Sequence, residues 1–180
     1  MLNKIGLSGM MLLAMIVVLV GGCSSGGSTG NGGGTQKPAA AAVTATVKIA
    51  AAGTLPTNST IGGVDLALTL PAGVTVKASP GSLSALVPDA GIVTASGAAA
   101  ANSRVYAVYT AGAGAAPGTV RILLANTAGF STGEFVTVKC DIASGSTPTT
   151  ADFSASGIKF VDGNGKLVDG LTTTVTADFQ

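Results

Sequence analysis

From residue 43 onward, hydrophobic and polar residues alternate in short runs that are separated by turn-forming residues. In VDLALTL (64–70), Val64 and the three leucines fall on one face of an extended chain, and Asp65, Ala67 and Thr69 fall on the other. Such alternation is typical of a β-strand with one buried face. The pattern predicts about nine strands, at residues 44–50, 64–70, 74–78, 92–96, 103–110, 119–125, 134–142, 157–161 and 172–179.

These predicted strands favour an all-β fold. No stretch repeats its hydrophobic residues every 3.6 positions with capping residues at its ends, so a helical fold is not expected. Short strands at spacings of roughly 8–12 residues are typical of an antiparallel β-sandwich. The segment SLSAL (82–86) is expected to form a single turn.

The same alternation predicts which side chains face the core. In SRVYAVYT (103–110), Tyr109 shares a face with Val105 and Ala107, whereas Tyr106 lies opposite. In EFVTVKCDI (134–142), the predicted core face carries Val136, Val138, Cys140 and Ile142. The opposite face carries Phe135, Thr137, Lys139 and Asp141.

Two segments resemble a known family. The strand–Pro-x-Gly–strand segment VDLALTLPAGVTV (64–76) is similar to the early hairpin of cohesin-like domains, and residues 118–168 resemble their C-terminal half. The resemblance implies a nine-stranded jelly-roll sandwich, a fold shared with carbohydrate-binding modules. It also implies a binding function, because cohesins bind dockerin partners in cellulosomes and similar domains occur widely outside them. No dockerin-contact residue can be transferred to a position of this chain.

Composition and charge narrow the range of partners. Hydrophobic residues make up 47% of the 180 residues, but aromatic residues make up only 4% and charged residues 9%. The formal net charge of +1 leaves no basic patch of the kind that binds nucleic acid. A nearly neutral surface suits proteins or sugars as partners.

The first 22 residues predict export. Lys4 precedes an apolar run from Ile5 to Val20, and the small residues Gly21 and Gly22 lead to Cys23. This arrangement is typical of a secretory signal peptide. The ending V-G-G-C resembles the lipobox of bacterial lipoproteins, which implies cleavage before Cys23 and acylation of that residue with chains such as palmitate. The alternative is a transmembrane anchor, but a run of about 16 residues is shorter than the roughly 20 that a spanning helix needs.

Residues 23–42 then predict a lipidated cysteine followed by a linker. The linker is rich in Gly, Ser and Ala and has almost no large apolar side chain, so it cannot form a core. The sandwich domain is expected at residues 43–180. By resemblance to lipoprotein sorting, Ser24 and Ser25 point to the outer membrane, with the domain at the periplasmic or the exposed face.

FVDGNGKLVDG (160–170) begins like a calcium loop. An EF-hand loop that starts at Asp162 would have Lys166 at position 5 and Leu167 at position 6, where an oxygen ligand and glycine are required. Asp-Gly-Asn-Gly is strong turn chemistry, so the segment predicts a hairpin between KFV and KLV. A weak surface calcium site made of Asp162, Asn164 and Asp169 remains as the alternative. No cofactor is expected.

Catalytic motifs are scarce. GFSTG (129–133) matches the G-x-S-x-G pattern with Ser131 as the nucleophile, but the chain has no histidine to serve as a base. Zinc sites need about four ligands, and Cys140 alone remains once Cys23 is acylated. We expect Cys140 to be an inert core thiol and the protein not to be an enzyme.

Sugar-binding sites usually stack sugar rings on exposed aromatic side chains, and the candidates are Tyr106, Tyr109 and a predicted loop residue, Phe130. One of the two tyrosines is expected in the core, because residues three apart on a strand point to opposite faces. The sequence therefore predicts a cell-envelope lipoprotein that binds another protein. Polysaccharide binding and self-association through strand edges are the two alternatives.

Overall fold

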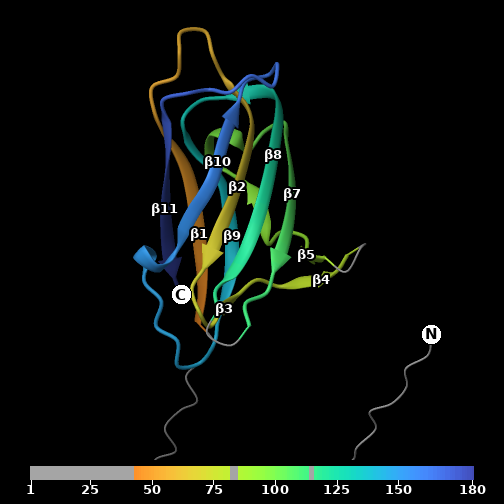
Figure 1. The fold of residues 1–180 in the computed structure, drawn as a ribbon, viewed down its shortest axis with the longest axis vertical. Coiled ribbons are helices and arrows are strands. Elements are labelled where there is room, and N and C mark those ends of the chain that lie inside the picture. The colour runs from red at the N-terminus through yellow and green to blue at the C-terminus, as the bar shows by residue number, and fades with distance from the viewer. Residues whose placement is uncertain (1–42, 82–84, 114–115) are drawn as a thin grey trace, which may run out of the picture. The chain divides into compact units, whose positions relative to one another are not determined.

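The computed structural model describes residues 43–81, 85–113 and 116–180, which form two packed antiparallel sheets (Figure 1). The first sheet has the order β11-β1-β9-β3, with β6 also paired to β9, and the second has the order β10-β2-β8-β7-β5-β4. The strands are β1 (Val43–Gly53), β2 (Ile61–Leu70), β3 (Val74–Thr75), β4 (Ala78–Pro80), β5 (Leu86–Pro88), β6 (Val93–Ala95), β7 (Ser103–Thr110), β8 (Gly118–Phe130), β9 (Gly133–Ile142), β10 (Ser154–Val161) and β11 (Leu171–Phe179). Short 3-10 turns cover Gly97–Ala99 (η2) and Thr150–Asp152 (η3). The antiparallel sandwich predicted from the alternation is confirmed.

Two differences raise the number of strands above the predicted nine. The predicted strand 74–78 is divided, because the chain leaves the first sheet after β3 and joins the second at β4. Val76, between them, is buried. The second difference is β5, which the sequence did not predict, since three residues ending in Pro88 are too few to show alternation.

The core lies between the two sheets and is formed by the alternate residues that the sequence predicted. Val47 and Ile49 of β1 and Leu66 and Leu68 of β2 are at most 1% exposed. Every residue of this core lies between Ala45 and Phe160, and both sheets lie within residues 43–180. Residues 43–180 therefore contain both sheets and the core that the described residues form between them.

Phe135 was predicted on the outer face of its strand, and this prediction is wrong. Ile49 of β1 pairs with Val136, but its neighbour Ala50 pairs with Glu134, so Phe135 is an extra residue in β9. A β-bulge of this kind turns the side chain of the extra residue to the other face. The Phe135 ring is fully buried. Its centroid lies 6.2 Å from that of Phe130 and 6.0 Å from that of Phe160.

Phe130 does not lie in a loop, as predicted, but is the last residue of β8 and only 4% exposed. Gly63 of β2 pairs with Ala125 of β8, but Ile61 pairs with Phe130. The four residues 126–129 of β8 therefore lie opposite the single residue Gly62 of β2. Asn126 stabilises this irregular segment by three hydrogen bonds. Its amide nitrogen donates to the Ala101 carbonyl (2.7 Å) and to Ser103 Oγ (2.9 Å), and its Oδ1 accepts from the Ala128 N–H (3.0 Å).

Residues 162–166 form the predicted tight turn. The Asp162 N–H donates to the Lys166 carbonyl (2.8 Å), and Val161 pairs with Leu167 in an isolated antiparallel bridge. KLV pairs back along KFV as far as Val168, whose N–H donates to the Phe160 carbonyl (2.9 Å), so the predicted hairpin is present but short. After this bridge the chain crosses to the other sheet, where β11 begins at Leu171.

Several predictions lie outside the described residues. They concern the signal peptide at 1–22, the acylated Cys23, the linker up to residue 42, and most of the turn expected at 82–86. Within the part of the chain that the structure describes, no helix is long and apolar enough to cross a membrane.

Candidate functional site

The outer face of the six-stranded sheet combines exposed apolar side chains with charged ones. Its central row runs across β7, β8, β2 and β10, because Tyr106 pairs with Leu123, Leu123 with Asp65, and Asp65 with Lys159. The next row begins with Val108 beside Arg121. Side chains in one row of a sheet are direct neighbours, so this register places aromatic, aliphatic, acidic and basic groups side by side.

Tyr106 and Leu123 are the most exposed apolar residues of this face. They are 56% and 41% exposed, and Val108 on the neighbouring row is half-buried. We call Tyr106, Val108 and Leu123 the Tyr106 patch. A tyrosine paired with a leucine on a flat sheet offers apolar area together with a phenol hydroxyl that can form hydrogen bonds.

The charges around the Tyr106 patch are mostly positive. Arg104, Arg121 and Lys159 point outward from this sheet, against the carboxylate of Asp65 on β2. A second carboxylate, Asp89, lines a hollow together with Tyr106. Arg121 donates to both oxygens of Asp65, at 3.3 Å from Nε and 3.0 Å from Nη2. The hydrogen bond and the charge of Asp65 raise the pKa of Arg121. The bidentate pair holds the guanidinium of Arg121 flat along the sheet beside the patch.

The three aromatic residues named as ligand candidates do not lie together. Tyr106 is exposed, whereas Tyr109 and Phe130 are 5% and 4% exposed and belong to the core. Tyr109 and Tyr106 lie on opposite faces of β7, as alternation predicts, and Tyr109 is the one that faces the core, while Phe130 is buried at the irregular end of β8. Neither buried ring can stack on a ligand, so these two assignments are corrected.

The outer face of the five-stranded sheet has a different character. Its outward-facing positions, exposed or half-buried, are rich in threonine and carry few large apolar side chains. They include Thr44, Thr46, Thr94, Thr137, Thr172, Thr174 and Thr176. Thr94 and Thr137 share a hydrogen bond of 2.9 Å, and Lys48 forms an ion pair of 2.7 Å with Asp178. This face therefore presents threonine hydroxyl and methyl groups, whereas the six-stranded sheet presents the aromatic ring of Tyr106.

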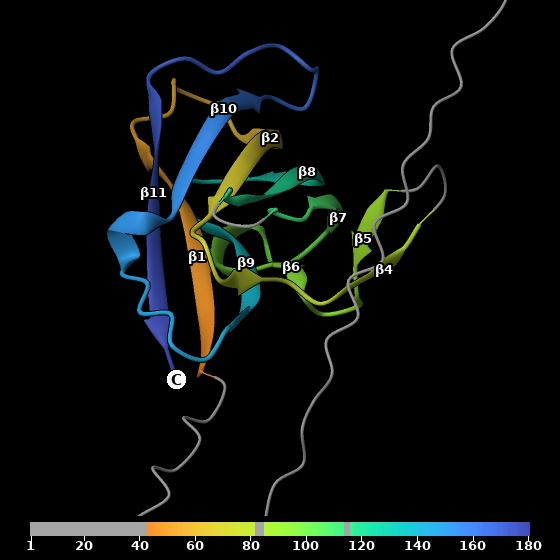
Figure 2. The same ribbon diagram turned by 60° about the horizontal axis from the view of Figure 1, so that its bottom comes forward.

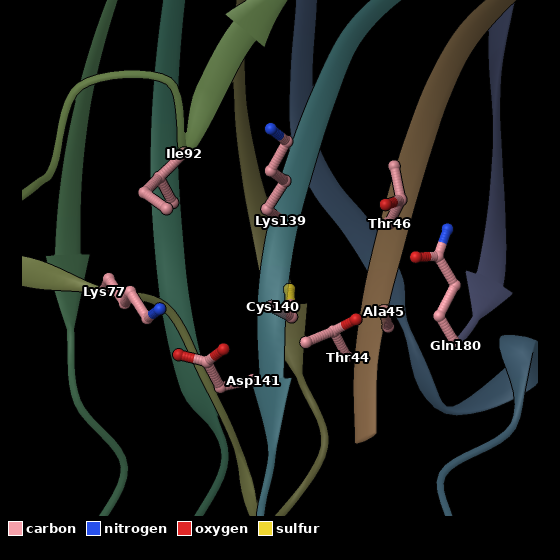
Figure 3. Close-up of a pocket in the computed structure, with 9 residues that line it drawn as sticks. All are labelled: Thr44, Ala45, Thr46, Lys77, Ile92, Lys139, Cys140, Asp141 and Gln180. Carbon is pink, nitrogen blue, oxygen red and sulfur yellow. The ribbon is translucent and has the colours of Figure 1, made fainter. Parts of the chain in front are cut away.

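A polar hollow lies at one end of that face (Figure 3). Lys77 and Asp141 point toward each other across it, and the side chains of Thr44 and Gln180 line its other side (Figure 3). Cys140 contributes to the wall, but its side chain is 2% exposed. Burial, and secondarily the charge of Asp141, raises the pKa of Cys140 to about 12. The thiol is therefore protonated at neutral pH and unsuited to nucleophilic or metal chemistry.

The carboxylate of Asp162 is engaged by its own turn. Its Oδ1 accepts the N–H groups of Asn164 (2.8 Å) and Lys166 (2.9 Å), and these hydrogen bonds lower the pKa of Asp162. The contact with Asn164, two residues on, is that of a structural Asx turn, and the contact with Lys166 closes the same turn. Among the described residues, no group of three or more acidic, cysteine or histidine side chains is placed to hold a metal ion.

Ser131 lies in the turn between β8 and β9. Its hydroxyl donates to the Thr132 carbonyl at 3.3 Å. A G-x-S-x-G nucleophile requires a turn from a strand into a helix, whereas here the chain passes from one strand to another. The motif match therefore has no supporting geometry.

Comparisons with known proteins found similarity to one solved structure. No family model and no curated protein matches the sequence. Among solved structures, a non-cellulosomal cohesin from the hyperthermophilic archaeon Archaeoglobus fulgidus is similar, with 19% sequence identity and a TM-score of 0.38. The match covers 62% of this chain and 66% of the archaeal chain. At these values the family remains a prediction, and the sandwich rests on the strand pairing described above.

Proposed function

We propose that residues 43–180 form a non-enzymatic module that binds another protein through the Tyr106 patch. The observation that supports this is the exposed pair of Tyr106 and Leu123, on neighbouring strands and beside Arg104 and Arg121. Tyrosine and arginine are enriched among the residues that contribute most to binding between proteins. A flat sheet face lets a partner contact all of them at once.

The charges around the patch indicate the kind of partner. Arg104, Arg121 and Lys159 on this face outnumber the two carboxylates near the patch. Asp65 is paired with Arg121, and Asp89 accepts a hydrogen bond from Ser79. Arg104 and Lys159 are exposed at opposite sides of the face. Complementary charge speeds association and selects partners, so we propose a partner with an acidic rim around an apolar contact.

Polysaccharide binding has less support at this face. A sugar platform uses several exposed rings, but only Tyr106 of the three aromatic candidates is exposed. The neighbours of Tyr106 on the sheet are aliphatic or charged. This composition fits the core of a protein interface better than a row of stacked sugars.

We further propose that Cys23 anchors the module to the cell envelope, most simply the outer membrane, through its lipid, with residues 24–42 as the linker. The support is the signal-peptide pattern followed by V-G-G-C. Several acyl chains on one residue give stable anchoring, since each buried methylene contributes about 0.8 kcal/mol. The module would then be presented at the membrane surface to proteins of the envelope or the medium.

The binding proposal predicts a specific loss of capture. Residues 43–180, immobilised through the N-terminus, are incubated with envelope and secreted extracts, and bound proteins and glycans are both identified. We expect the variant Tyr106→Ala/Leu123→Thr to bind the captured protein at least about 30-fold more weakly, because truncating a central interface residue costs about 2 kcal/mol or more. Raising the salt concentration should weaken capture by the unchanged module.

A matched control places two substitutions on the other sheet, Thr137→Ala/Thr176→Ala. This control should capture the same protein as the unchanged module. Equal capture by all three modules would contradict the assignment of the face, and recovery of glycans alone would favour the polysaccharide alternative.

The anchoring proposal predicts that Cys23→Ser abolishes acylation. The full chain and this variant are expressed in a two-membrane bacterium that is fed a palmitate analogue with a chemical tag. We expect label on the unchanged chain only, together with retention of the leader in the variant, since cleavage depends on lipidation. An unlabelled full chain that still sediments with membranes would instead identify a transmembrane anchor.

A further inference from the structure

Three of the four sheet edges carry features that prevent them from pairing with another strand. In the first sheet, β3 and β6 have only two and three residues. In the second sheet, β4 has three residues and ends in Pro80, while β10 is interrupted by a bulge at Gly157 and carries Lys159. Short strands, proline, bulges and lysine are the usual means of blocking edge-to-edge association.

The fourth edge, β11, has none of these features. It pairs with β1 in unbroken register from Leu171 to Phe179 and is the outermost strand of its sheet (Figure 2). The sequence LTTTVTADF is rich in residues that favour strands, and its one charged residue is Asp178, near the end. A long, regular and uncharged edge is a template for another strand.

The backbone groups on the open side of β11 can be assigned. Thr44 and Gln180 exchange two hydrogen bonds of 2.9 and 2.8 Å, so even-numbered residues of β11 point their N–H and C=O groups toward β1. Odd-numbered residues point theirs outward. Accordingly, the outward carbonyl of Ala177 accepts the Thr150 hydroxyl of η3 at 3.4 Å.

The C-terminal end of this edge is thus covered by η3, and the part near Leu171 is open. There a hollow separates β11 from β10, lined by Ile158–Phe160, the segment Leu167–Gly170 and Leu171–Thr173. Leu167 beside it is 57% exposed. The open stretch, Leu171–Val175, is long enough for a short strand pairing.

We propose that two copies of the protein associate through these edges, with the β11 strands antiparallel about a twofold axis at Thr173. In this register Thr173 faces Thr173 of the second copy, and Leu171 faces Val175 of the second copy. Thr172 and Thr174 face each other on the outer side. The overlap contains no charged residue, so no like charges meet, and apolar residues oppose apolar ones.

An independent observation favours the axis at Thr173. Among the described residues, its Oγ1 is one of three buried side-chain polar atoms that have no hydrogen-bond partner. Threonine pairs that face each other across antiparallel strands commonly share a hydrogen bond. Because this oxygen is covered in the single copy, a rotation of Thr173 about χ1 on pairing turns its hydroxyl toward that of the second copy and provides the missing partner. The Tyr106 patch lies on the other sheet, so this proposal is independent of the proposed function.

The test uses residues 43–180, which contain the entire core, in sedimentation velocity runs from about 1 µM to 1 mM. We expect a monomer–dimer equilibrium that shifts with concentration. The variant Thr172→Lys/Thr174→Lys places like charges opposite each other twice, and we expect it to dimerise about tenfold more weakly. The matched variant Thr172→Lys/Thr174→Asp places opposite charges at the same pairs, and we expect it to dimerise more tightly than the Lys/Lys variant.

Hydrogen exchange provides a second measurement. The N–H groups of Thr173 and Val175 should become protected as concentration rises, whereas those of Thr172 and Thr174, which bond to β1, should be protected throughout. The substituted side chains lie on the exposed face, so we expect both variants to fold. Circular dichroism checks this. A monomer at every concentration, or a dimer that responds equally to both variants, would overturn the proposal.

Discussion

Replacing Phe135 with alanine is expected to lower the free energy of unfolding by roughly 3–5 kcal/mol, the usual cost of removing a buried phenylalanine. The ring is fully buried and contacts Phe130 and Phe160, which belong to the opposite sheet. Its loss leaves a cavity between the sheets, where no neighbouring side chain is free to collapse. Denaturant unfolding of residues 43–180, followed by circular dichroism, measures the change.

Two variants complete this experiment. Phe135→Leu retains much of the volume and should cost clearly less than Phe135→Ala. Tyr106→Ala removes an aromatic ring from the surface and should change stability by no more than about 0.5 kcal/mol. If Phe135→Ala and Tyr106→Ala had the same small effect, the bulge that directs Phe135 into the core would be refuted.

Replacing Asn126 with leucine is expected to cost about 2–4 kcal/mol, although leucine has a similar size and is more hydrophobic. Asn126 is 6% exposed and makes three hydrogen bonds to residues on both sides of it in the chain. Its removal takes away all three hydrogen bonds, each of which contributes about 0.5–1.5 kcal/mol. Thermal and denaturant unfolding should both report the loss.

Ser103→Ala is the matched control for the Asn126 network. It removes only one acceptor of the Asn126 amide and leaves the two backbone contacts in place. Its cost should therefore be about 1 kcal/mol or less. An Asn126→Leu variant as stable as the unchanged protein would show that the irregular end of β8 does not depend on these bonds.

Alternation along the chain was sufficient to predict the sandwich and most of its core. It correctly placed Tyr106 and Tyr109 on opposite faces of β7, since this assignment requires only the two-residue period of the strand, but which of the two lies in the core is evident only from the structure. It failed at Phe135 and Phe130, because both depend on how many residues face a partner strand. A bulge is a property of two strands together, and one strand alone does not reveal it.

The candidate site was only partly predictable for a related reason. Leu123 belongs to the apolar run ILLA, in which alternation is masked, so its outward direction is evident only from its pairing with Tyr106. Arg121 and Asp65 are 56 residues apart in sequence, and only the register of β2 and β8 brings them together. The openness of the β11 edge likewise depends on the position of every other strand.

The placement of β1 has a mechanical consequence for a tethered module. Any pull from the preceding residues enters the sandwich at Val43, the first residue of β1, and runs along the strand. β1 is bound on both sides, by β11 and by β9, in antiparallel register over nearly its whole length. Such a pull loads both ladders in shear, so the hydrogen bonds must break together and cannot open one after another. The strand that receives the load is thus held by two ladders at once, and its extraction requires both to break.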